Sequence, residues 1–200
     1  MIKELLPLTK QKLKILKYIY DEKETHMLDI SKKLKIHPYS LSKTLKLLNP
    51  FLTQKFHGKT ISLSLNNNLG YYNELVYLIE DYKLETDNKI LKLLVKNLRI
   101  LFPNVLSCMI FGSYARIGGG DDIDLLFIVK GNGKESREIL DSCNKLSILL
   151  NKEVNPVVMN ENEFEIALKE KDPTISSILE PSQHLLVTGK EYFLKKIRER

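Results

Sequence analysis

Residues 111–129, FGSYARIGGGDDIDLLFIV, decide how the sequence is interpreted. An apolar run ends in a Gly-Ser turn, a glycine triplet follows, and Asp122 and Asp124 then stand two residues apart in a second apolar run. Side chains alternate between the two faces of a strand, so both carboxylates point the same way if this run is a strand. Packing gains nothing from two acids on one strand face, which makes the pair a candidate for holding a ligand.

The residues around this pair predict a phosphate and metal site. Gly112 lets a ligand approach the backbone closely. Ser113 offers a hydroxyl and a backbone N–H at a predicted helix start, where the helix dipole favours negative charge. Asp122 and Asp124 are then placed to bind divalent cations that bridge to phosphate oxygens. Ordinary solvent-facing acids are the alternative, and the apolar residues that alternate with the pair, beginning with Ile123, argue against it.

At these residues the sequence resembles the minimal nucleotidyltransferases, small members of the DNA polymerase beta superfamily. Their signature, GS-x-A-R-G and then S-D-I-D-L, stands here as GSYARI and then DDIDL. The resemblance runs from about residue 105 to the end of the chain and implies a mixed β-sheet packed with helices. It implies that Gly112, Ser113 and Arg116 contact a nucleoside triphosphate and that Asp122 and Asp124 ligate Mg²⁺ or Mn²⁺.

The sequence departs from the family pattern at the third acid. Ile117 and Asp121 replace a glycine and a serine and leave the core pattern intact, but Asn155 stands where transferring members carry an aspartate. An amide cannot act as a base, and losing a general base costs ~10²- to 10⁴-fold in rate. Glu153 shares the strand face and is the candidate catalytic substitute, although two residues along a strand span ~7 Å. Impaired catalysis is therefore favoured over rescue, and whether the chain is an enzyme stays open.

The amino-terminal third carries most of the positive charge. Residues 1–65 contain 13 Lys and Arg against 5 Asp and Glu, a net +8, and the other 135 residues contain 18 against 20, a net −2. Apolar spacing predicts a helix that follows the cap Thr9, a second near residues 27–34 and a third that begins at Pro38. A hairpin follows, with Gly58 at its turn. The residues expected in the core include Leu28, Ile30, Leu34, Leu41, Leu45, Leu48, Ile61, Leu63 and Leu65.

Three helices and a lysine-bearing hairpin resemble the winged helix-turn-helix domains of bacterial and archaeal regulators. The resemblance implies that the third helix faces the major groove of double-stranded DNA and that the hairpin, or wing, lies near phosphates. The groove-facing residues would be Tyr39, Ser42, Lys43 and Lys46, and the wing residues Lys55, His57 and Lys59. Winged helices also serve as protein-docking or dimerisation modules with solvated lysines, and this alternative stays open. Because such regulators are often dimers, a homodimer is an expectation.

The chain is thus expected to be an α+β protein of three parts: a winged helix-turn-helix over residues 1–66, a helical connector over 67–103, and a nucleotidyltransferase-like domain over 104–200. Its apolar runs are far shorter than the ~20 residues that cross a bilayer, so no membrane partner and a cytoplasmic location are expected. Cys108 and Cys143 are expected to be buried thiols.

Two functions follow from these expectations. The first is a DNA-binding transcriptional regulator whose second domain binds a nucleoside triphosphate and Mg²⁺ and catalyses poorly. The alternative is an active transferase that moves a nucleoside monophosphate onto a hydroxyl. By family analogy, that alternative includes an antitoxin-like role with a toxin partner.

Overall fold

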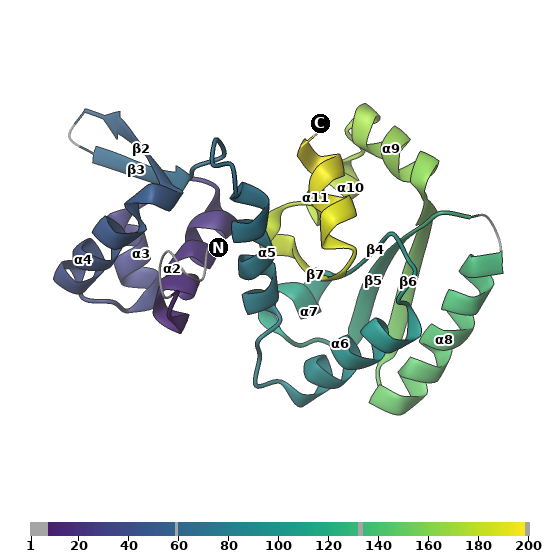
Figure 1. Cartoon of the computed structure of the whole chain (residues 1–200). Helices are drawn as coiled ribbons and strands as arrows, with labels where there is room; N and C mark the ends of the chain where they lie inside the picture. The colour runs from purple at the N-terminus through teal and green to yellow at the C-terminus, as the bar shows by residue number, and fades with distance from the viewer. Residues whose placement is uncertain (1–7, 59, 132–133, 199–200) are drawn as a thin grey trace. The chain divides into compact units, whose positions relative to one another are not determined.

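The computed structural model describes residues 8–58, 60–131 and 134–198. The chain forms two compact units, Met1–Tyr82 and Lys83–Arg200. Both combine helices with a β-sheet, so the chain has an α+β fold (Figure 1). In the described residues, no helix is long and apolar enough to cross a membrane.

The first unit contains helices around a small antiparallel sheet. Its helices are α2 (Lys10–Glu22), α3 (Met27–Leu34), α4 (Pro38–Leu48), the 3-10 turn η1 (Asn49–Phe51) and α5 (Tyr72–Lys83), whose last residue belongs to the second unit. Its strands are β1 (Thr25–His26), β2 (Leu52–His57) and β3 (Thr60–Leu65), in the order β1-β3-β2. The Thr9 hydroxyl caps α2 by accepting from the Lys12 N–H, and Pro38 begins α4, as predicted. The two-residue strand β1 was not predicted from the sequence.

The core of this unit confirms most of the predicted apolar positions. Ile30, Leu41, Leu48, Leu63 and Leu65 are buried in one cluster with residues of α2 and α5. Two expectations are wrong. The side chain of Leu28 is 60% exposed because it lies on the outer side of α3, and that of Ile61 is 41% exposed because it lies near the hairpin turn.

The second unit contains a mixed four-stranded sheet. Its strands are β4 (Ser107–Phe111), β5 (Asp122–Val129), β6 (Glu153–Asn160) and β7 (His184–Thr188), in the order β6-β5-β4-β7. Only β5 and β6 run parallel; the other pairs are antiparallel. Its helices are α6 (Lys89–Leu101), α7 (Gly112–Ile117), α8 (Lys134–Leu150), α9 (Glu161–Glu170), α10 (Pro173–Ile178), the 3-10 turn η2 (Pro181–Gln183) and α11 (Lys190–Arg198).

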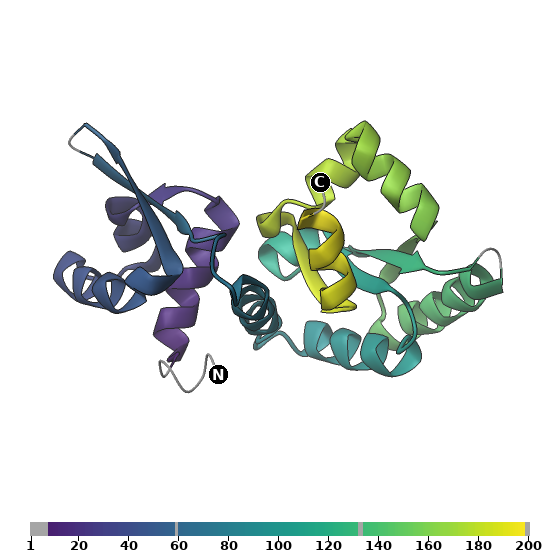
Figure 2. The same ribbon diagram turned by 45° about the horizontal axis from the view of Figure 1, so that its top comes forward.

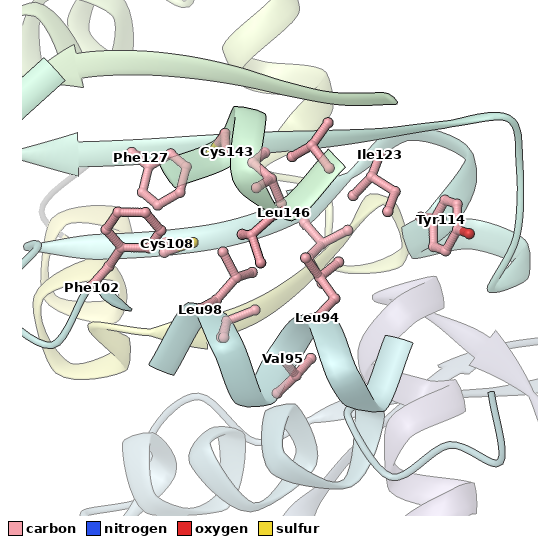
Figure 3. Close-up of a cluster of buried hydrophobic side chains, with 14 of the residues drawn as sticks. Leu94, Val95, Leu98, Phe102, Cys108, Tyr114, Ile123, Phe127, Cys143 and Leu146 are labelled. Atoms are coloured by element: carbon pink, nitrogen blue, oxygen red, sulfur yellow. The ribbon is translucent and has the colours of Figure 1, made fainter. Parts of the chain in front are cut away.

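Alternation along β5 gives its two faces different roles. Ile123, Leu125 and Phe127 are fully buried in a cluster with residues of α6 and α8, part of which Figure 3 shows. Asp122 and Asp124 therefore lie on the opposite face of the sheet. The same cluster contains Cys108 and Cys143, and both are buried free thiols, as predicted. Burial raises the pKa of Cys108 and raises that of Cys143 to about 12.

The predicted connector, residues 67–103, contains two helices that belong to different cores. Leu75 and Ile79 of α5 are buried in the core of the first unit. Leu94 and Leu98 of α6 are buried against the sheet of the second. The chain passes from one unit to the other at the end of α5.

Ion pairs link the acidic helix α9 to the terminal helix α11. Lys196 of α11 forms ion pairs with Glu161, at 3.5 Å, and with Glu165. Glu163 instead completes a capping box with Asn160. These contacts help to hold α9 and α11 together.

Candidate functional site

The two aspartates lie beside the turn between β4 and α7. Asp122 and Asp124 are half-buried, and Phe111, the last residue of β4, is the register partner of Asp124. Gly112 follows with φ +70°, in the left-handed region that favours glycine. A Cβ added there would lie 3.5 Å from Asp124 Cγ and closer still to Oδ2. The absent side chain of Gly112 therefore leaves the space that the Asp124 carboxylate occupies.

Ser113 also lies at this turn, against the glycine triplet. Its Oγ is buried and has no hydrogen-bond partner among the described residues. A Cβ added at Gly120 would lie 3.2 Å from Ser113 Cβ and closer still to Oγ. A buried hydroxyl without a partner costs free energy, so this atom marks a place where a ligand could supply the missing partner.

The surroundings of Asp124 disfavour its ionised form. Burial raises its pKa above the ordinary aspartate value, and the charge of Asp122 raises it further. A hydrogen bond with the Asn155 side chain acts in the opposite direction and lowers it. Neither carboxylate forms an ion pair with a described residue. Two like charges at one half-buried place without a counterion are the arrangement that a bound cation stabilises.

In the neighbouring strand, an amide and not an acid stands beside Asp124. In the parallel register of β5 and β6, Asp122 is opposite Glu153 and Asp124 is opposite Asn155. Asn155 is half-buried and reaches Asp124, whereas Glu153 is exposed. In the part of the chain that the structure describes, no three His, Cys, Asp or Glu side chains form a group that could hold a metal ion. The site therefore has two carboxylates and an amide.

Two residues that the sequence did not indicate anchor the glycine triplet. Lys152 donates from Nζ to the Gly120 carbonyl at 2.6 Å, and Asn88 donates from Nδ2 to the Gly118 carbonyl. The Oδ1 atom of Asn88 also accepts from the Leu91 N–H and so caps α6. The sequence could have identified Asn88 as a helix cap, which is a local feature. The bonds from Asn88 to Gly118 and from Lys152 to Gly120 join residues 30 and 32 positions apart, so no local sequence signal predicts them. Arg116, the third expected nucleotide contact, is exposed at the end of α7.

The exposed side of α4 carries the predicted DNA-contacting residues. Tyr39, Lys43 and Lys46 are exposed, and Ser42 is half-buried. The Lys43 ammonium lies 4.5 Å from the centroid of the Tyr39 ring, a cation–π contact one helical turn apart. This face thus presents two cations and an aromatic ring that the core does not use.

The hairpin presents a less positive surface than the sequence suggested. His57 Nε2 lies 3.4 Å from Glu24 Oε1, and Glu24 also accepts from the Ser62 hydroxyl. That hydrogen bond, and then the charges of Lys55 and His57, lower the pKa of Glu24. Lys55 is exposed, and Lys59 lies outside the described residues. Glu24 therefore offsets part of the wing's charge.

Comparison with known proteins gives little beyond these residues. No protein-family model matches the chain, and no curated protein matches it. A chain in a crystal structure of a mutant of the toxin-antitoxin pair MntA-HpeT is similar, with 20% sequence identity and a TM-score of 0.37. The match covers 54% of this chain and 83% of that chain. At this level of similarity, the functional assignment rests on the site residues themselves.

Proposed function

We propose that the second unit binds a nucleoside triphosphate together with a divalent cation held by Asp122 and Asp124. The observation that carries the proposal is the uncompensated pair of half-buried carboxylates beside the Gly112 turn. Hard cations such as Mg²⁺ prefer carboxylate oxygens and keep positions open for phosphate oxygens. When bound, the cation would neutralise the pair and bridge it to the triphosphate.

The residues at the turn support the phosphate part of this proposal. The unpartnered Ser113 hydroxyl can donate to a phosphate oxygen, which would supply the hydrogen bond that the described residues do not provide. The guanidinium of the exposed Arg116 is suited to bidentate contact with phosphate. Lys152 and Asn88 hold the adjacent loop in place, so the chain does not have to order it on binding.

Binding without efficient transfer is the outcome that the third position favours. The Asn155 amide occupies the strand position beside Asp124 and cannot accept a proton from an attacking hydroxyl. Nucleotidyl transfer to a hydroxyl is the second candidate function, with Glu153 as the base. The register that places Glu153 opposite Asp122 is the observation that favours it. An antitoxin-like role with a toxin partner belongs to this second candidate.

Calorimetry with ATP and Mg²⁺ tests the binding proposal, and label transfer from α-labelled ATP tests the second candidate. Asp122→Asn and Asp124→Asn should each abolish cation-dependent ATP binding, whereas Asp141→Asn, at an exposed position of α8, should leave it unchanged. Equal binding by all three variants would refute the proposed site. Label transfer that is lost in Glu153→Gln and retained in Asn155→Ala would establish Glu153 as the base.

For the first unit, we propose binding to double-stranded DNA through α4 and the β2–β3 hairpin, as in a transcriptional regulator. Residues 30–73 contain seven lysines and no Asp or Glu. Tyr39, Lys43 and Lys46 stand on the exposed side of α4 in the middle of this stretch. A surface of one sign attracts a polyanion, and the binding should weaken steeply with salt.

A salt series of DNA-binding assays tests this second proposal. The slope of log affinity against log salt is negative, and each lost phosphate contact reduces its magnitude by about 0.9. Lys43→Ala combined with Lys46→Ala should therefore reduce that magnitude by about 1.8. The matched control is Lys92→Ala with Lys96→Ala, at exposed positions of α6 in the second unit, which should leave the slope unchanged. Equal slopes for both double variants would remove α4 as the DNA contact.

A further inference from the structure

The β2–β3 hairpin presents an exposed apolar pair close to its turn. Phe56 and Ile61 are register partners in this antiparallel ladder. The Phe56 side chain is 73% exposed, the largest value for an aromatic side chain among the described residues, and that of Ile61 is 41% exposed. Directly opposite residues of an antiparallel pair have their Cβ atoms about 5 Å apart. The two side chains therefore form one contiguous apolar surface.

The same strand face is buried at the other end of the hairpin. Side chains alternate, so Phe56 and Ile61 share their face with Leu52, Leu63 and Leu65, which are 5–7% exposed. Figures 1 and 2 show that the end of β2 and the start of β3 reach beyond the helices of the first unit. The apolar face thus continues past the part of the sheet that the helices cover.

The charges around this pair indicate which partner covers it. Both residues lie within residues 30–73, which contain seven lysines and no Asp or Glu. Lys55 and His57 flank Phe56 on the opposite strand face, where Glu24 pairs with His57, and α4 carries Lys43 and Lys46. A second copy of the chain would bring an identical positive segment against this one, and like charges oppose that pairing. An anionic partner with apolar surface between its charges is favoured instead.

We propose that Phe56 and Ile61 form an apolar wedge that enters the minor groove of double-stranded DNA and partly unstacks a base step. This inference rests on the proposed DNA-binding function of the first unit. Between its phosphates, a duplex offers stacked bases whose faces are apolar, and apolar side chains inserted between base steps bend duplexes by about 20–90°. The lysines of α4 would supply the phosphate contacts, while the wedge would select steps that unstack easily, such as TA.

The test measures DNA bending separately from DNA binding. The full-length chain is added at about 50 mM salt to a duplex of about 20 base pairs with TA steps and a fluorophore at each end. The unsubstituted protein should raise energy transfer between the ends. Phe56→Ala should lose most of this rise while keeping the salt slope of binding. Phe56→Leu should restore part of it, and Thr60→Ala, at an exposed position of the same hairpin, should bend DNA like the unsubstituted protein.

Several results would overturn the wedge, and they are distinguishable. If Phe56→Ala bends the duplex fully, or if the unsubstituted protein binds without bending, the wedge is wrong and DNA binding stands. If the unsubstituted protein binds no duplex at low salt, the proposed DNA-binding function fails and the wedge with it. If Phe56 is needed for binding to vesicles of phosphatidylcholine and phosphatidylserine but not for bending DNA, the hairpin is a membrane contact. Thermal unfolding of each variant confirms that the exposed substitutions leave the fold intact.

Discussion

Gly112→Ala should separate backbone strain from damage to the carboxylate pair. Gly112 and Gly118 both have φ +70°. An alanine in the left-handed region costs roughly 1–2 kcal/mol at either position. For a unit of this size, each kcal/mol lowers Tm by roughly 4 °C, so both variants should lose roughly 4–8 °C. The two positions differ in what the new methyl group meets: nothing within 4 Å at Gly118, and the Asp124 carboxylate at Gly112.

The consequence for cation binding should follow that difference. At Gly112 the methyl group must displace Asp124 from its place beside Asp122, because Cγ would lie 3.5 Å away and Oδ2 closer. Disturbing a group that orients a metal ligand costs about 10- to 100-fold in affinity. Titration calorimetry with Mn²⁺ and ATP should show this loss in Gly112→Ala and not in Gly118→Ala. Equal affinity in the two variants would refute the assignment of Asp124 as a cation ligand.

Three further predictions concern the same site. Asn155→Asp should tighten Mn²⁺ binding by about tenfold, because it adds a carboxylate to the site. It should also lower the Tm of the cation-free protein, because the new charge lies opposite Asp124 and repels it. Thermal scans with and without Mn²⁺ measure both effects. Lys152→Met should cost about 1 kcal/mol through loss of the hydrogen bond to the Gly120 carbonyl, and Lys145→Met, at an exposed position, should cost less than half of this in urea denaturation. Because the pKa of Asp124 is raised, Mn²⁺ affinity should begin to fall at a higher pH, as the solution is acidified, than it would at an aspartate of ordinary pKa. In the cation-free protein, the same carboxyl group contributes stability at low pH, and this stability is lost as the pH rises through the raised pKa. Calorimetry at a series of pH values follows both effects.

Local signals accounted for the elements that could be predicted from the sequence. The Thr9 cap, Pro38 and the apolar spacing placed α2, α3 and α4, and the structure confirms them. The two-residue spacing of Asp122 and Asp124 placed both on one strand face, because strand alternation depends only on neighbouring residues. These features need no knowledge of what lies opposite them in the fold.

Contacts between distant residues could not be predicted in this way. The bonds from Lys152 and Asn88 to the glycine triplet depend on how β6 and α6 lie in the folded unit. The pairing of His57 with Glu24 depends on where the end of α2 meets the hairpin. The exposure of Leu28 has the same cause, since helical spacing identifies an apolar position but not whether another element covers it.

The Asn155 amide explains how two half-buried carboxylates can remain in a folded unit although no described residue forms an ion pair with either of them. A third carboxylate opposite Asp124 in the neighbouring strand would add repulsion that the described residues do not offset. The amide instead donates a hydrogen bond to Asp124, which favours its ionised form against the effects of burial and of Asp122. The ionised form is the one that binds a cation. In the nucleotide-binding site that we propose, an amide at position 155 also leaves transfer without a base there, so the same residue would favour binding over catalysis.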